Sequence, residues 1–126
     1  MLSIIHMNGY QNFLTIFIEL EIKLKPAIAQ ALPVNVKNCW QEAHQYFQTH
    51  LENCLDPESL DPEMETETYH QWTSLHTEIK REVRLLNTDF LFWQSARQPK
   101  TQLARQTSCW QRSQKLIRYC QMILEL

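Results

Sequence analysis

The sequence predicts an all-α protein, an antiparallel helical bundle of about four helices with one long central helix. Its 126 residues include a single glycine, Gly9, whereas a β-sandwich or barrel of this length would need several glycines in its tight turns. Apolar residues also recur at steps of three and four along most of the chain. With 44% hydrophobic residues the chain can build one core, so we expect a single domain over residues 1–126.

The first two helices are predicted on either side of a proline-containing connection. In the first, from Asn8 to about Ala29, residues 18–25 alternate as a strand would, but the helical steps cover more of the segment. Pro26 should kink or end this helix, because proline removes a hydrogen bond and crowds the preceding turn. The second helix is expected from about Asn35, with an apolar stripe of Val36, Cys39, Trp40, Ala43, Phe47, Leu51 and Cys54.

The last two helices follow an acidic link over residues 56–67. Asp61 is suited to cap the third helix, and Pro62 to occupy its first position. Apolar positions then continue at Tyr69, Trp72, His76, Ile79, Val83, Leu86, Phe90 and Trp93 until Pro99, which predicts a helix of roughly 35 residues. The fourth helix is expected from about Thr101, with a core stripe of Leu103, Trp110, Ile117, Cys120 and Leu124.

Charge is segregated along the chain. Residues 1–79 carry three lysines and eleven acidic residues, whereas residues 80–126 carry nine basic and three acidic residues. The basic half could bind an acidic protein or, as an alternative, a nucleic acid; the two halves could equally pair with each other. The candidate partner-binding residues lie off the predicted core stripes of the last two helices: Lys80, Arg81, Arg84, Arg105, Arg112, Lys115 and Arg118.

Motifs for chemistry are sparse. Cys39, His44, His50 and Cys54 share the second helix, but no Cys-x-x-Cys or Glu-x-x-His accompanies them, so we expect neither a metal nor another cofactor. His76 falls on the core stripe and is interpreted as a core histidine bonded to a carboxylate. No phosphate-binding glycine loop or nucleophile elbow occurs, and the protein is predicted not to be an enzyme.

The stretch LLNTDFLFWQ, residues 85–94, is apolar around most of its helix. Leu85, Leu91 and Phe92 lie outside the main stripe, which suggests a symmetric homodimer whose contact includes this part of the long helix and could extend to the N-terminal helix. The competing interpretation is a monomer in which Phe13, Phe17 and Trp110 cover these side chains. Asp89 would need a partner if buried, and Arg97 or Arg105 could supply it.

The N-terminus has no basic leader, and its apolar run is too short to span a membrane. Together with four cysteines that need not be oxidised, this favours a cytoplasmic protein without membrane insertion. Met7 is an alternative start to Met1.

The C-terminal half also resembles a known family over about residues 76–124. The segment HTEIKREVRLLNTDFLFWQSARQPKTQLARQ and the later LIRYCQMIL are similar to the PatD-like heterocyst-frequency control proteins of cyanobacteria. The resembling positions are Glu78 to Lys80, Leu85, Leu86, Asp89, Ala96 to Pro99, Arg105 and Leu116 to Cys120. The resemblance implies a non-enzymatic regulator of cell division and differentiation that binds the tubulin-like protein FtsZ.

Overall fold

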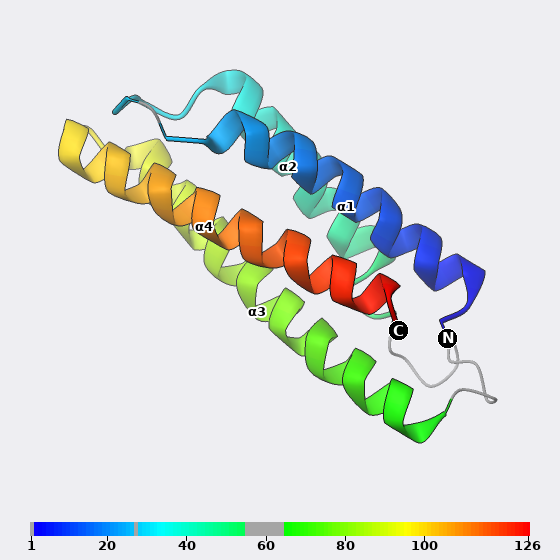
Figure 1. Cartoon of the computed structure of the whole chain (residues 1–126). Helices are drawn as coiled ribbons and strands as arrows, with labels where there is room; N and C mark the ends of the chain where they lie inside the picture. Colours follow the sequence, from blue (N-terminus) through cyan, green and yellow to red (C-terminus); the bar gives the residue numbers. More distant parts are fainter. Residues whose placement is uncertain (1, 27, 55–64) are drawn as a thin grey trace.

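Helices make up most of the described structure. The computed structural model describes residues 2–26, 28–54 and 65–126, which form α1 (Ile4–Leu24), α2 (Val34–His50), α3 (Thr66–Ser95) and α4 (Pro99–Leu124). The four helices run alternately up and down, so the N- and C-termini lie at the same end (Figure 1). Helix α1 packs against α2 and α4, and α3 packs against α4. The predicted all-α antiparallel bundle is confirmed.

Each helix boundary has a local cause. Helix α1 begins at Ile4, earlier than the predicted Asn8, because the Ser3 hydroxyl accepts the His6 backbone N–H at 3.3 Å. It ends at Leu24 rather than near Ala29, and Lys25, which precedes Pro26, is extended with ψ of 116°. Helix α2 begins at Val34, directly after Pro33, one residue before the predicted start.

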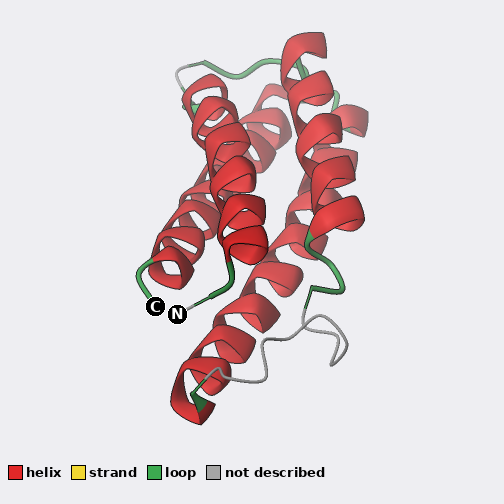
Figure 2. Cartoon of the chain, turned by 90° about the vertical axis from the view of Figure 1, so that its right-hand side faces the viewer, coloured by secondary structure: helices red, strands yellow, loops and turns green. Residues whose placement is uncertain are grey.

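The long third helix is confirmed, with 30 residues between Thr66 and Ser95, or about 45 Å at 1.5 Å per residue. Its first turns extend beyond the end of α4 that carries the C-terminus (Figure 2). The predicted cap Asp61 and first-turn Pro62 lie outside the described residues. The helix stops at Ser95, and Pro99 begins α4 instead of only ending α3, because proline fits the first position of a helix.

Aromatic side chains fill the interior between the helices. Phe13 and Phe17 of α1 meet edge to face at 4.7 Å between ring centroids, and Trp40 of α2 stacks on Phe90 of α3 at 5.0 Å. The Trp93 indole N–H donates to the Gln30 carbonyl at 2.9 Å, which ties the α1–α2 connection to α3. These contacts place all three helices around one core.

The predicted core stripe of α4 is wrong by about one position. The residues that α4 buries are Gln106, Cys109, Ser113, Leu116, Cys120 and Ile123, and only Cys120 was among those predicted. Leu103 is 40% exposed, while Trp110, Ile117 and Leu124 are half-buried. Cys109 and Ser113 are small, and the buried Ser113 hydroxyl donates a hydrogen bond to the Cys109 carbonyl at 2.9 Å. This face of α4 can therefore approach α3 and α1 closely. A search for large apolar residues therefore selects the neighbouring, half-covered face.

Candidate functional site

An open groove runs between α2 and α3, and two stripes of side chains face each other across it. Along α2 the stripe is Lys37, Gln41, His44 and Gln48; along α3 it is Lys80, Arg84, Asn87, Leu91 and Gln94. Both stripes follow the same spacing of four and three residues, which keeps them on one face of each helix. We refer to this feature as the α2–α3 groove.

The groove consists of two adjoining hollows of about 330 and 210 Å³, which share His44 and Asn87. Its floor is apolar and is formed by buried side chains of both helices, namely Trp40, Phe47, Val83 and Phe90. From Lys80 to Gln94 the α3 wall is roughly 21 Å long at 1.5 Å per residue. This length corresponds to about four turns of a docked helix.

Large side chains at the contact explain why the groove exists. The Trp40 ring lies between the two helices, stacked on Phe90, and its indole N–H donates to Asn87 Oδ1 at 3.3 Å. His44 stacks on the same indole at 5.0 Å between centroids, with 9° between the planes. Interhelical distance grows with the size of the side chains at the contact, so this stacked layer holds the helices apart.

Positive charge dominates the groove walls. Lys37, Lys80 and Arg84 line it, and none of the three forms an ion pair with another residue that the structure describes. Among the described residues that line the groove, Glu52 is the one acidic residue. Burial lowers the pKa of His44, with a smaller opposing effect of Glu52, so this ring adds no full charge near pH 7. The groove therefore has an apolar floor and a basic rim.

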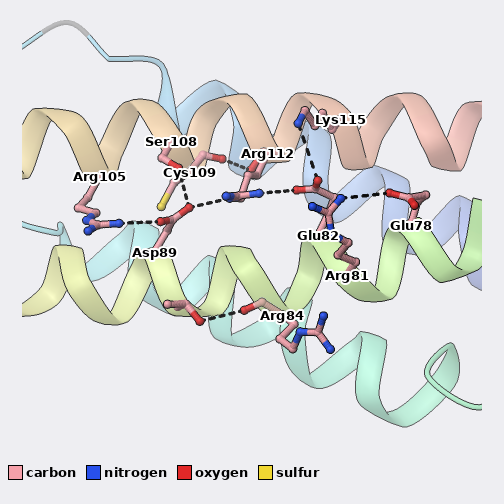
Figure 3. Close-up of polar contacts among 12 residues, drawn as sticks. Glu78, Arg81, Glu82, Arg84, Asp89, Arg105, Ser108, Cys109, Arg112 and Lys115 are labelled. Carbon is pink, nitrogen blue, oxygen red and sulfur yellow. Dashed lines mark hydrogen bonds and ion pairs between the residues drawn. The ribbon is translucent and has the colours of Figure 1, made fainter.

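A second polar feature lies on the other side of α3, in its interface with α4 (Figure 3). Arg112 donates from Nε to Asp89 Oδ2 at 2.8 Å and from Nη1 to Glu82 Oε2 at 2.9 Å. Arg105 reaches Asp89 Oδ1 at 3.1 Å, and the Ser108 hydroxyl donates to Asp89 Oδ2 at 2.6 Å. The predicted pairing of Asp89 with Arg105 is thus present, whereas Arg97 is exposed and is not part of it.

The predicted basic surface is divided by this arrangement. Arg105, Arg112 and Lys115 face Glu82 and Asp89, with Lys115 Nζ 3.8 Å from Glu82. Arg81 pairs with Glu78 at 3.6 Å on the same helix, and Arg118 is exposed on α4. Only Lys80 and Arg84 enter the groove, and Figure 3 shows Arg84 pointing away from α4. The seven candidate residues therefore do not lie on one face: Lys80 and Arg84 line the α2–α3 groove, whereas Arg105, Arg112 and Lys115 lie at the α3–α4 interface.

This pairing also answers how the basic half is neutralised. The carboxylates that hold Arg105, Arg112 and Lys115 are Glu82 and Asp89, which belong to the same half of the chain. Among the described residues, one salt bridge joins the two halves, the 3.6 Å contact of Arg81 with Glu78 one turn away on α3. The other carboxylate partners of the basic half lie within that half. The acidic residues of the 56–64 segment lie outside the described residues.

The predicted self-association residues are divided in the same way. Leu91 is 60% exposed and lies in the α2–α3 groove, whereas the Phe92 ring lies under the Arg105 guanidinium, 4.6 Å from its centroid. Leu85 is half-buried. The monomer interpretation, in which Phe13, Phe17 and Trp110 cover these side chains, does not hold for Leu91 and Phe92, which remain 60% and 51% exposed.

His76 is buried as predicted, but its partner is not a carboxylate. Nδ1 of His76 lies 2.7 Å from the hydroxyl of Tyr10, which accepts the indole N–H of Trp72 at 2.8 Å. The Cys54 thiol lies 3.3 Å from the same hydroxyl. Burial lowers the pKa of His76 to about 4, opposed by a hydrogen bond to the backbone of Glu52. The His76 ring is hydrogen-bonded to the phenol of Tyr10, where a hydrogen bond to a carboxylate was expected.

The remaining cysteine and histidine residues of α2 do not assemble into a site. Cys39 is buried, His50 is exposed, and across the described ranges no three His, Cys, Asp or Glu side chains are placed to hold a metal ion. None of the described helices is long and apolar enough to cross a membrane.

The spacing of the groove residues is visible in the sequence, but the apolar core positions alone do not reveal it. Lys80 and Arg84 were predicted to bind a partner through their charge, and Leu91 was predicted to mediate self-association. Their common spacing with Asn87 marks a second face of α3. The matching residues Lys37 and His44 were not selected, because a half-exposed polar stripe on α2 resembles any solvated helix face.

In comparisons with known proteins, no family model, no curated protein and no solved structure matches the chain.

Proposed function

We propose that this protein is a non-enzymatic regulator that acts by binding another protein, and that the α2–α3 groove is its binding site. The observation that carries the proposal is the combination of an apolar floor, three lysine or arginine side chains without an ion pair to a described residue, and a length of about four helical turns. Such a groove suits an amphipathic helix whose apolar side chains enter it and whose acidic side chains meet its rim.

The chemistry of the rim selects the partner. Lys80 and Arg84 project from α3 on one wall, and Lys37 projects from α2 on the other. Acidic residues on both flanks of an apolar stripe would therefore each find a cation. An apolar floor makes no favourable contact with a phosphate backbone, and Arg105 and Arg112 already form ion pairs with carboxylates. A protein partner is therefore favoured over the alternative of a nucleic acid.

The sequence resemblance to the heterocyst-frequency control proteins supplies a specific candidate. It supports FtsZ as the partner, and with it a role in restraining cell division and differentiation in a cyanobacterium. Of the resembling positions on α3, Lys80 lines the groove, whereas Leu86 is buried in the core and Asp89 faces α4.

Reversing the charge of the groove should weaken binding to purified FtsZ. We expect Lys80→Glu combined with Arg84→Glu to raise the dissociation constant at least tenfold, because two attractive contacts become repulsive. Fluorescence anisotropy with labelled FtsZ at physiological salt would measure this, and co-sedimentation with FtsZ polymers would confirm it. The effect should shrink in high salt, since the rim is solvent-accessible.

Arg118→Glu is the matched control, because Arg118 is exposed on α4 outside the groove. It adds one reversed charge to the same protein and should change the dissociation constant by less than about twofold if the site is local. Equal losses from the groove and control variants would contradict the groove as the site. Absence of any FtsZ binding by the wild-type protein would contradict FtsZ as the partner.

A further inference from the structure

The seam between α1 and α4 presents a surface unlike the rest of the molecule. From Ile4 to Ile18, helix α1 contains no Lys, Arg, Asp or Glu, although the whole chain is 21% charged. Its exposed apolar residues include Ile4, Ile18 and Ile22, which are 76%, 42% and 69% exposed. Asn8, Gln11 and Thr15 are exposed between them. Between Ile4 and Ile18 this exposed face combines isoleucines with neutral polar residues and has no charge, which is unusual on the surface of a helical bundle. The charged residues of α1 begin beyond it, at Glu19.

Helix α4 continues this surface. Two contacts fix the seam: the Trp110 N–H donates to Glu21 Oε1 at 2.8 Å, and the Gln106 amide donates to the Leu24 carbonyl at 3.4 Å. The α4 residues beside the seam repeat every seven positions and are again uncharged, namely Leu103, Thr107, Trp110, Gln114, Ile117 and Gln121. We call the exposed residues of α1 and α4 along this seam the neutral face.

We infer that the neutral face is the contact between two copies of this chain in a two-fold symmetric dimer. Across a two-fold axis each patch meets itself, so a charged patch would oppose like charges, whereas a neutral patch would not. Asparagine, glutamine and threonine side chains both donate and accept hydrogen bonds, and can therefore pair with their own copies. Lysine, arginine and ionised carboxylates cannot do this. The chemistry of the face is thus self-complementary, and a second copy is the partner it fits.

The position of this face leaves the α2–α3 groove accessible. Helix α1 contacts α2 and α4, and α4 contacts α3, so the α1–α4 seam and the α2–α3 groove are opposite edges of the bundle. A dimer through the neutral face would present two grooves facing outward. It differs from the dimer predicted through Leu85, Leu91 and Phe92, because Leu91 lies in the α2–α3 groove and Phe92 lies under Arg105 of α4.

The dimer is tested on the purified full chain by light scattering and sedimentation equilibrium, without any partner. We expect a mass near twice 15.1 kDa at roughly 50 μM. Ile18→Lys combined with Gln114→Lys should shift the protein to a monomer, because two new cations on each copy would face their counterparts. Ile18→Glu combined with Gln114→Glu should do the same, and mixing the two variants should restore the dimer.

Leu91→Lys is the control, since it adds a cation at an exposed position inside the opposite groove and should leave the mass unchanged. Circular dichroism of each variant checks that helicity is retained, and recovery of the dimer on mixing excludes misfolding as the cause of a monomer. A wild-type mass near 15.1 kDa at roughly 50 μM would overturn the inference. So would a dimer that survives both charged variants but dissociates on changing Phe92→Lys.

Discussion

Replacing Arg112 with methionine is expected to lower the free energy of unfolding by about 3 kcal/mol, because it leaves buried carboxylates without their main partner. Arg112 bridges Glu82 and Asp89, whose side chains are 2% and 7% exposed. Asp89 would retain Arg105 and Ser108, but Glu82 would keep only Lys115 at 3.8 Å. The loss therefore falls at the lower end of the range of about 3–5 kcal/mol for breaking a buried ion pair.

Urea unfolding followed by circular dichroism would measure this loss. Arg118→Met is the matched control: it removes the same charge from an exposed position of α4 and should change stability by less than about 0.5 kcal/mol. Combining Arg112→Met with Glu82→Gln should recover part of the loss, because the unpaired charge is then removed as well. A loss below about 1 kcal/mol for Arg112→Met would show that the network contributes little to stability.

The sequence predicts the helices well because their signals are local. The 3.6-residue period, Pro26 and Pro99 mark the elements and their approximate ends, and Pro99 needed only a different assignment, from the end of one helix to the start of the next. The start of α1 was missed because Ser3 precedes two exposed isoleucines, which do not belong to the core stripe.

The packing of the helices against one another was harder to predict. The apolar stripe of a helix shows which face is buried, but not which neighbouring helix lies on each side of that face. Asp89 was expected to need Arg105 because an acidic residue within an apolar run requires a partner. Glu82 was overlooked, although its seven-residue spacing from Asp89 matches the spacing of Arg105 and Arg112 on α4. Matching spacings of opposite charge on consecutive helices would have predicted the network and removed Arg112 from the candidate surface.

The α4 core stripe was missed for a different reason. Prediction by hydrophobicity favours Trp110 and Ile117 over Cys109 and Ser113, yet the smaller residues occupy the interior. Close helix contact needs small side chains, and the surplus apolar residues remain on the neutral face. A stripe of large apolar residues beside a stripe of small ones therefore indicates two contacts, one inside the bundle and one at its surface.

Acidification should destabilise the protein through His76 by about 3 kcal/mol in total. Its pKa is about 4 in the folded protein and 6.5 in the unfolded chain, so the two states bind the same number of protons above pH 6.5. As the pH falls below 6.5, His76 becomes protonated in the unfolded chain but stays neutral in the folded protein. The free energy of unfolding therefore falls by about 2 kcal/mol by pH 5. The loss is complete below pH 4, where both states are protonated.

His76→Gln isolates this effect, because glutamine can bond to the Tyr10 hydroxyl and stays neutral at every pH. Urea unfolding at pH 8 and at pH 5 would measure the effect. Relative to His76→Gln, the free energy of unfolding of the wild-type protein should fall by about 2 kcal/mol between pH 8 and pH 5. The control is His50→Gln, at the exposed last residue of α2, and it should follow the wild-type curve. Parallel curves for wild type and His76→Gln would mean that the buried ring accepts a proton as readily as the unfolded chain, which its burial against Tyr10 and Trp72 argues against.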